Sequence, residues 1–287
     1  MTILSRQMLL DYRARSFRSS PSLRVNTIDE AVDFVNRSGF VFFWPVKDVL
    51  MPSLWVAAAG DRPVPDEHDD PGHKTWSWKD RLLGKRRWYY SRVLRRRNTI
   101  ISLDDIPYFY ALSPNFGDPD NDYLQQYEQG RLTNEARKVY AALLKEGPLD
   151  TIHLRQASQL ASASSNTRFN RALEDLQIEL KIMPVGISDA GAWHYAFIYD
   201  IVTRHMPEIQ EKARFISDEA ARQRIAGDYF RSVGAAPNNY LNRLFRWSPE
   251  ECEDTLDRLE RAGVIHRNIQ VEGETGAWDC MRDLVTI

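Results

Sequence analysis

The densest group of side chains that could do chemistry lies in one short stretch. Asp66-Glu67-His68-Asp69-Asp70-Pro71-Gly72-His73 holds four carboxylates and two imidazoles, groups that bind divalent ions or activate water. No spacing within it fixes a ligand geometry, and adjacent acids on a loop with Pro and Gly are commonly only solvated. We therefore expect no metal and no cofactor, and an acid–base role for this loop stays open.

The strongest electrostatic feature is a basic and aromatic patch. Seven cations fall within 13 residues with no acid among them: Lys85, Arg86, Arg87, Arg92, Arg95, Arg96 and Arg97. Trp88, Tyr89 and Tyr90 lie between them. Cations neutralise phosphates and aromatic faces stack on bases, so the patch predicts contact with nucleic acid. The alternative is a helix with buried aromatic rings and solvated arginines.

Two stretches, Thr133 to Asp200 and Ser217 to Val285, have the pattern of one repeated module. In each, a capping Thr or Ser opens a helix, Gly ends it, a short polar helix follows, and a third helix carries paired leucines. Two apolar strands around a Gly-containing turn complete the pattern. Three helices and a β-hairpin make up the winged-helix plan. We predict a helix-rich α+β fold of tandem winged-helix modules.

The third helices of the two repeats differ in charge. The first offers Arg168 and Arg171, with Lys181 just beyond it, to a phosphate surface. The second holds six carboxylates against two arginines: Glu250, Glu251, Glu253, Asp254, Asp257 and Glu260. We expect the first helix to contact DNA, although a solvated helix that binds nothing is the alternative. The acidic module predicts a scaffolding or protein-contact surface.

The first segment of the chain is less regular. The capping box that begins at Thr27 predicts a helix that ends near Gly39, and the apolar run Phe40 to Trp44 predicts a buried strand. This order of helix and strand is typical of the back half of a further winged helix. We expect three domains: a winged-helix-like segment at 1–125 with the basic patch, a winged helix at 126–210 and an acidic winged helix at 211–287.

Composition limits the class of protein. The 287 residues are 43% hydrophobic and 27% charged, with a net charge of −2, so any DNA contact depends on local basic patches. No apolar run approaches ~18 residues, which argues against a membrane-spanning helix. Two cysteines do not form a disulfide framework or a cysteine-based zinc site. We expect a cytoplasmic protein.

Short motifs along the chain point to a family. They are Trp-Pro-Val-Lys-Asp (44–48), Gly-Asp-Arg-Pro (60–63), Arg-Arg-Trp-Tyr-Tyr (86–90), Tyr-Phe-Tyr-Ala-Leu-Ser-Pro (108–114) and Tyr-Phe-Arg-Ser-Val-Gly-Ala-Ala (229–236). With the tandem modules, they resemble the AlkZ/YcaQ family of DNA glycosylases, and most closely the proteins labelled AlkZ-related. The resemblance implies a protein that associates with DNA; members of the family release alkylated bases or unhook interstrand crosslinks.

The chain differs from this family at the positions of the family's catalytic residues. The glycosylases carry Gln-Φ-Gln or Gln-Φ-Asp on an early strand, a pair implicated in water activation, but the equivalent positions here are Phe42-Phe43-Trp44. None can orient or deprotonate water, because two are hydrocarbon and indole only donates. The family's Tyr-Trp-x-His stretch falls near Tyr89 to Arg92, without His.

Three functions follow as hypotheses. The leading one is a protein that binds double-stranded DNA in repair or regulation without the family's catalytic pair. A second is an active glycosylase or other nucleic-acid enzyme that uses different polar residues, for which Asp48, Glu67 and His68 are the candidates. A third is a scaffold or ligand-responsive regulator that binds a protein partner through the acidic last module.

Overall fold

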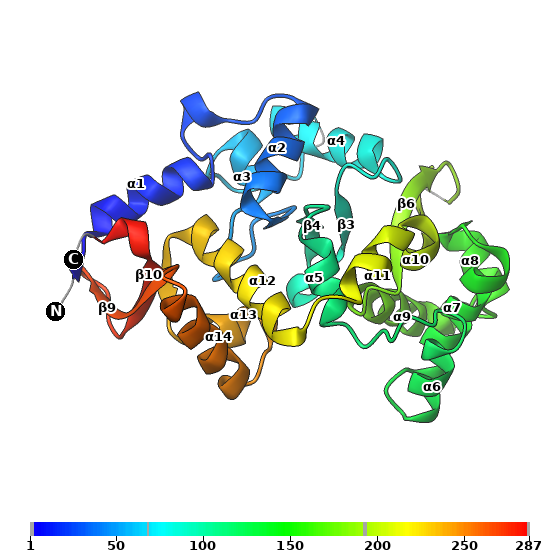
Figure 1. Ribbon diagram of the computed structural model, residues 1–287. Helices are drawn as coiled ribbons and strands as arrows, with labels where there is room; N and C mark the ends of the chain where they lie inside the picture. The colour runs from blue at the N-terminus through cyan, green and yellow to red at the C-terminus, as the bar shows by residue number, and fades with distance from the viewer. Residues whose placement is uncertain (1–2, 68, 192–193, 286–287) are drawn as a thin grey trace.

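The same order of elements occurs three times along the chain. The computed structural model describes residues 3–67, 69–191 and 194–285, and its fold is α+β and rich in helices, as predicted (Figure 1). Each time, a helix is followed by a short strand, two helices and two further strands. The first of the three strands pairs with the last, so each unit has its own small sheet. We call these units the first module (28–101), the second module (134–201) and the third module (218–281).

The first module begins at the predicted capping residue, since the Thr27 side chain accepts from the Glu30 amide. Its elements are α2 (Ile28–Ser38), β2 (Phe40–Phe42), α3 (Leu54–Ala59), a 3₁₀ turn (Pro71–His73), α4 (Lys74–Leu82), β3 (Tyr89–Arg92), a second 3₁₀ turn (Leu94–Arg96) and β4 (Asn98–Ile101). All strands are antiparallel, in the order β2-β4-β3.

The expectation that the first helix and strand form the back half of a module is wrong. α2 and β2 are the front half, because α3 and α4 follow them before the hairpin. The sequence hides α3, since Leu54 to Ala59 are all apolar and all buried and leave no helical period to detect. Apolar residues of α2, α3, α4 and the sheet form one core.

The second module carries the predicted cap at Thr133, which accepts from the Ala136 amide. Its elements are α7 (Asn134–Glu146), β5 (Leu149–Asp150), α8 (Thr151–Ala157), a 3₁₀ turn (Ala163–Ser165), α9 (Asn166–Ile178), β6 (Ile182–Ser188) and β7 (Ala196–Ile201). α5 (Ile106–Ala111) and α6 (Asp122–Glu128) connect it to the first module. Phe169, Ala172, Leu173 and Leu176 are buried on α9, as the spacing predicts.

The third module follows α10 (Val202–His205) and α11 (Pro207–Ala213). It consists of α12 (Asp218–Val233), β8 (Ala235–Pro237), α13 (Tyr240–Phe245), α14 (Pro249–Arg261), β9 (Ile265–Val271) and β10 (Trp278–Met281), with a last 3₁₀ turn at Arg282–Leu284. Ser217 caps α12 and Ser248 forms the predicted capping box at the start of α14. Gly234 ends α12 with a φ of 78°, a left-handed conformation that suits glycine.

One acidic side chain of the third module is fully enclosed. Asp279 on β10 is 0% exposed, and its Oδ1 accepts from the Asn268 amide at 3.3 Å. Arg267 lies 3.8 Å away, too far for a hydrogen bond. Burial raises the pKa of Asp279 to about 6, because the charged form loses its hydration.

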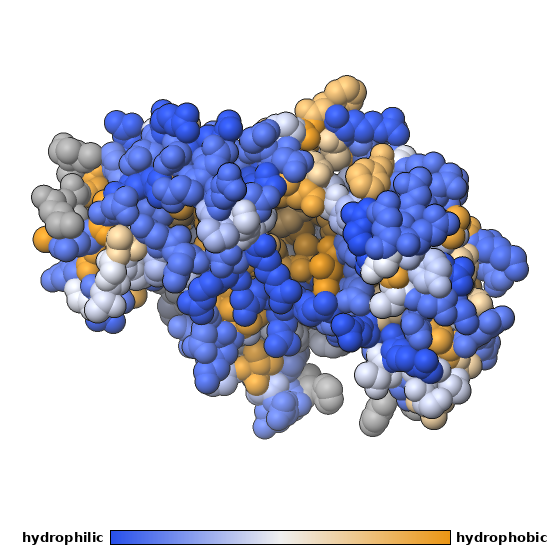
Figure 2. Space-filling model, turned by 90° about the horizontal axis from the view of Figure 1, so that it is seen from below, coloured by the Kyte–Doolittle hydropathy of each residue, from blue (hydrophilic) through white to orange (hydrophobic). Residues whose placement is uncertain are grey.

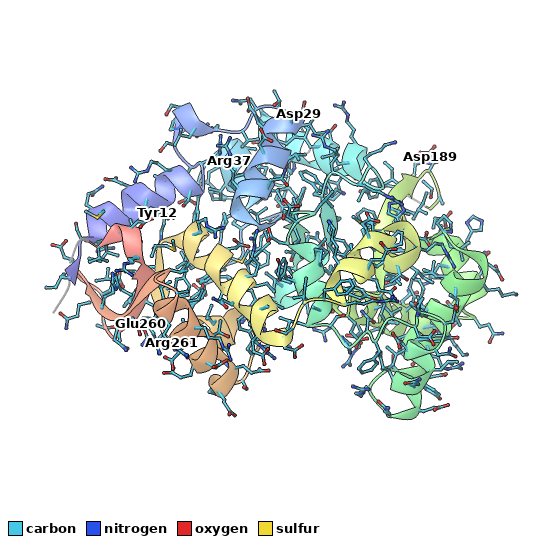
Figure 3. The ribbon with its side chains drawn as sticks, viewed as in Figure 1. Tyr12, Asp29, Arg37, Asp189, Glu260 and Arg261 are labelled. Carbon is cyan, nitrogen blue, oxygen red and sulfur yellow. The ribbon has the colours of Figure 1, made fainter. Side chains whose placement is uncertain are left out.

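The first residues of the chain pack against its last module. β1 (Ile3–Leu4) pairs in parallel with β9, and α1 (Arg6–Ser16) packs on α12. Tyr12 points from α1 towards α12, where its hydroxyl donates to the Arg231 carbonyl (Figure 3). Arg13 donates to the carbonyls of Val233 and Ala235 at 3.0 and 2.8 Å. A short 3₁₀ turn, Pro21–Leu23, leads from α1 to the first module.

The three modules are not separately packed. The largest apolar core includes Phe40 and Tyr89 of the first module, Met183 of the second, and Tyr229 and Leu256 of the third. A smaller core lies in the second module and also includes Tyr123 of α6 and Leu132. The predicted boundaries at 125 and 210 therefore cross a common interior, and where the domains divide stays a prediction. In the described part of the chain, no helix has both the length and the apolar character needed to cross a membrane.

Candidate nucleic-acid interface

The turn between β3 and β4 presents arginines to solvent. Leu94 is buried, and its amide donates to Thr99 Oγ1 at 3.1 Å, which fixes the turn. Arg95 and Arg96 follow with φ of 53° and 59°, in the left-handed region that non-glycine residues seldom adopt. Because Leu94 points inward, the side chains of Arg95, Arg96 and Arg97 lie outside the core.

Three hollows lie next to one another around this turn. Their volumes are 290, 250 and 310 Å³; the first and second share Lys47, and the first and third share Arg96. We call the three adjacent hollows together the basic groove. Eight cations line it, from all three modules and the residues just before α7: Lys47, Arg92, Arg95, Arg96, Arg97, Arg131, Arg171 and Arg243. Four carboxylates face them: Asp48, Glu174, Asp175 and Glu179.

Part of this positive charge is neutralised within the groove. Glu174 accepts from Arg92 at 3.2 Å and from Arg96 at 2.9 Å, and Asp175 accepts from Arg96 at 2.9 Å. These hydrogen bonds raise the pKa of Arg96 and tie α9 to the β3–β4 turn. Ion pairs this exposed are worth only ~0.2–1 kcal/mol each, so a phosphate can compete for the same guanidinium groups.

Other cations of the groove remain available. Lys47 and Arg97 are exposed, and neither side chain has an ion-pair partner among the described residues. Arg95 donates to the Arg243 carbonyl at 2.6 Å, which holds the turn against α13. Sequence reasoning missed Lys47, Arg131 and Arg243. Of these three, only Lys47 could have been found from the sequence, because it follows the apolar strand within the Trp-Pro-Val-Lys-Asp motif.

The predicted basic patch does not form a single surface. Lys85, Arg86 and Arg87 precede β3, whereas Arg92 to Arg97 follow its other end. Arg86 donates to the His205 carbonyl on α10, and Arg87 pairs at 2.9 Å with Asp29. Figure 3 shows Asp29 at the upper edge of the molecule, beyond the end of β3 that lies away from the groove. The aromatic residues Trp88, Tyr89 and Tyr90 are buried, so their rings cannot stack on bases.

The cations predicted in and beyond α9 fall in three different places. Arg171 lines the groove, is 75% exposed, and lies 3.8 Å from Asp175. Arg168 lies outside the groove and pairs with Glu135 at 3.2 Å. The prediction for Lys181 needs correction, because its side chain is only 2% exposed and donates to Asn115. Burial lowers the pKa of Lys181 to about 8.

The three residues that the resemblance places at the family's catalytic positions, Phe42 to Trp44, lie in different surroundings. Phe42 lies in the core shared by the modules and Phe43 in the core of the first module, and both are buried. Trp44 lines the basic groove beside Lys47 and Asn98. Its indole offers no acceptor for the proton of a water molecule.

The candidates for an acid–base role are scattered. Asp48 is exposed and lines the groove with a φ of 59°, while Glu67 is exposed on the loop before the Pro71–His73 turn. His68 lies outside the described residues. On that loop Asp70 pairs with Arg62, and His73 contacts the Pro65 carbonyl at 3.2 Å. Within 3–67, 69–191 and 194–285, no group of three or more His, Cys, Asp and Glu is arranged to hold a metal ion.

The acidic third helix of the third module is largely paired with arginines. Arg267 on β9 donates to Glu253 at 2.9 Å and also to Asp257. Arg258 donates to Asp254 at 2.8 Å, and Arg222 on α12 donates to Glu251. These pairs reduce the net negative charge of α14, and its predicted role in binding a protein partner stays a prediction.

The hydropathy of the surface agrees with a polar exterior around a central hollow. Figure 2 shows mostly hydrophilic atoms on the face seen from below, with hydrophobic atoms visible inside a hollow near its middle. A pocket of 360 Å³ lies between the modules, lined by Leu94, Leu112, Leu180, Ile225 and Phe245 among others. The modules thus meet incompletely around their common core.

Comparison with known proteins places this fold. The AlkZ-related family model matches residues 25–246. No curated protein matches the chain by sequence. Among solved structures, Streptomyces sahachiroi DNA glycosylase AlkZ is similar, with a TM-score of 0.58 and 12% identity over 98% of this chain and 71% of that one. At this identity the likeness shows the fold. The family match covers most of the sequence, and the chain belongs to the AlkZ-related family.

Proposed function

We propose that this protein binds double-stranded DNA through the basic groove, in a role related to DNA repair. The observation that carries the proposal is the groove itself, in which cations from separate parts of the chain line three adjacent hollows. Membership of the AlkZ-related family, and the fold shared with a DNA glycosylase, support a nucleic-acid partner. Phosphate neutralisation by Lys and Arg supplies most of the affinity of such an interface.

We interpret the three modules as winged helices that hold the groove open between them. α9, the third helix of the second module, contributes Arg171, Glu174 and Asp175 to the groove. The β3–β4 turn of the first module contributes its arginines from the opposite side. DNA would then be held between a helix and a hairpin turn from different modules, and base readout by one inserted helix is not required.

The groove favours binding over base excision. Trp44 occupies the position at which the family's resemblance implies a water-activating Gln or Asp. Glu174 lines the same hollow, where each of its oxygens accepts a hydrogen bond from an arginine. We propose that this chain lacks the base-excising chemistry of the characterised glycosylases.

One observation supports an enzyme as the second candidate. Asp48 is an exposed carboxylate within the groove, where it could meet a DNA sugar or base. To test this candidate, wild type and Asp48→Asn are each incubated with duplexes that carry alkylated or crosslinked bases. Release of free base by wild type that is lost in the variant would establish catalysis and overturn the binding-only proposal.

The binding test reverses two groove charges. Fluorescence anisotropy with a labelled duplex is measured for Lys47→Glu combined with Arg97→Glu, over a range of salt concentrations. If each residue meets one phosphate, the slope of log K against log salt becomes shallower by about 1.8. The expected loss of affinity at low salt is about 10-fold or more.

The control carries the same change of charge at the other end of β3. Lys85→Glu combined with Arg87→Glu alters net charge equally but leaves the groove intact. We expect this control to bind much more tightly than the groove variant. Equal weakening in both would refute the groove as the interface. Failure of wild type to bind any duplex at low salt would refute DNA binding and favour the protein-scaffold hypothesis.

A further inference from the structure

A second pocket lies on α4, separated from the basic groove by one tryptophan. Its volume is 680 Å³. Its lining includes Trp76, Ser77 and Asp80 from α4, and Tyr195, which directly precedes β7. We call it the aromatic pocket. Trp76 is 40% exposed, although it is a large ring that usually lies inside a protein. The pocket therefore presents aromatic surface to solvent.

A buried lysine holds the pocket's rings in place. Lys79 is 1% exposed, and its Nζ lies 4.1 Å from the Trp76 ring centroid and 4.7 Å from that of Phe197. It also donates to the Tyr195 hydroxyl at 2.7 Å and pairs with Asp80 at 2.7 Å. A desolvated cation over an aromatic face is a strong contact. Lys79 therefore fixes Trp76 and Tyr195 as a rigid surface.

The pocket also has polar groups at its edge that are ready to bind a ligand. The Tyr195 hydroxyl donates to Asp80 Oδ1 at 2.8 Å, and Lys79 pairs with the same oxygen. Asp80 Oδ2 and the Ser77 hydroxyl have no hydrogen-bond partner among the described residues. A planar ring that lies on Trp76 would place a donor on its edge within reach of the carboxylate.

Trp44 connects this pocket with the basic groove. Its indole lines the groove beside Lys47. The same ring lies 6.3 Å from Trp76 and 5.8 Å from His73, measured between ring centroids, and both of these residues line the aromatic pocket. A DNA strand bound in the groove would therefore be separated from the aromatic pocket by about one aromatic ring, that of Trp44.

We propose that the aromatic pocket receives a single nucleobase extruded from a duplex held in the basic groove. The base stacks on Trp76 and Tyr195, and an exocyclic amino group donates to Asp80 Oδ2. Adenine and cytosine carry such an amino group and thymine does not. The inference rests on the proposed function, because the groove must first hold the duplex. No chemical step is required of the pocket.

The proposal predicts a measurable difference in affinity between matched and mismatched duplexes. A mispaired base costs less to extrude than a paired one, so a protein with a base pocket prefers a mismatched duplex. Stacking on one aromatic platform is expected to give a preference of about 10-fold. A C·A mismatch should be preferred to a T·T mismatch, since only the former offers an amino group.

The experiment compares matched, C·A and T·T duplexes by anisotropy for wild type and four variants. Trp76→Ala removes the platform, and Trp76→Phe keeps an aromatic face. Ser77→Phe fills the pocket from an exposed position on α4, so it leaves buried contacts unchanged. Ser164→Phe makes the same change at an exposed position outside the pocket. Thermal unfolding shows that each variant is folded.

The outcomes separate the two proposals. We expect wild type, Trp76→Phe and Ser164→Phe to prefer the C·A duplex, and Trp76→Ala and Ser77→Phe to bind all three duplexes alike. If Trp76→Ala does not fold, the result for Ser77→Phe alone decides whether the aromatic pocket binds a base. Equal binding of the three duplexes by wild type, or an unchanged preference in Ser77→Phe, would refute the pocket and leave the groove standing. Absence of any duplex binding would refute both.

Discussion

Removing one carboxylate from the basic groove should strengthen DNA binding. Glu174 holds both Arg92 and Arg96 through its two oxygens, and these arginines are 49% and 40% exposed. Glu174→Gln keeps the size and shape of the side chain but removes the charge that competes with phosphate. The usual expectation for a groove residue is the opposite, namely loss of binding on substitution.

The size of the effect follows from the contacts. The two ion pairs are exposed and worth ~0.2–1 kcal/mol each, so their loss alters the stability of the fold little. The groove residues then comprise the same eight cations against three carboxylates instead of four. If one more guanidinium meets a phosphate, the salt slope steepens by about 0.9, and affinity at low salt rises roughly three- to tenfold.

The assay is anisotropy with one duplex between about 50 mM and about 200 mM salt, a range over which one phosphate contact changes affinity about 3.5-fold. Asp254→Asn is the matched control, because it breaks the 2.8 Å pair with Arg258 on α14, away from the groove. Both variants lose one negative charge. The reasoning is refuted if Glu174→Gln binds no more tightly than Asp254→Asn and has the same slope.

Three further predictions concern the fold and its buried charges. Asp279 ionises near its ordinary value of 3.8 when unfolded and at about 6 when folded, so its contribution to stability is present below about pH 3.8 and lost as pH rises through about 6. Asp279→Asn should therefore become more stable relative to wild type by up to about 3 kcal/mol between pH 4 and pH 8, measured by urea unfolding, and a pH-independent difference would contradict this. Lys181→Met should leave DNA affinity and its salt slope unchanged in the anisotropy assay, because the ammonium group is buried, and a shallower slope would return Lys181 to the interface. Gly234→Ala should destabilise the protein by about 2 kcal/mol or more in urea unfolding, since φ is 78° and a Cβ would lie 2.8 Å from Tyr12. Gly186→Ala, whose nearest neighbour would be 3.5 Å away, is the control, and equal losses in both variants would count against the steric argument.

Local signals predicted the start of helices well. Thr27, Thr133, Ser217 and Ser248 all cap helices with their side-chain oxygens, because capping depends on residues three positions apart and needs no tertiary contact. The buried face of α9 followed from its 3.6-residue period in the same way. The family resemblance, carried by short motifs, is confirmed by the match over residues 25–246.

The site could be predicted only in part, because it depends on distant pairings. Charge density alone grouped Lys85 with Arg97, yet β3 separates them, and no local pattern shows that the strand runs between two surfaces. Glu174 lies 82 residues from Arg92 along the chain, so the sequence did not indicate that it partly neutralises the patch. Lys181 looked like a surface cation because only the tertiary fold encloses it.

The docking of α1 on the third module has a consequence for biosynthesis. Residues 3–16 are synthesised well before α12 and β9, the elements on which they pack. At roughly 5–20 residues per second, α1 waits on the order of tens of seconds for its binding surface. Leu4 and Leu9 remain uncovered during that interval, which makes them natural contacts for a chaperone. Synthesis of the β9–β10 hairpin would then displace the chaperone and let β1 and α1 pack on the third module.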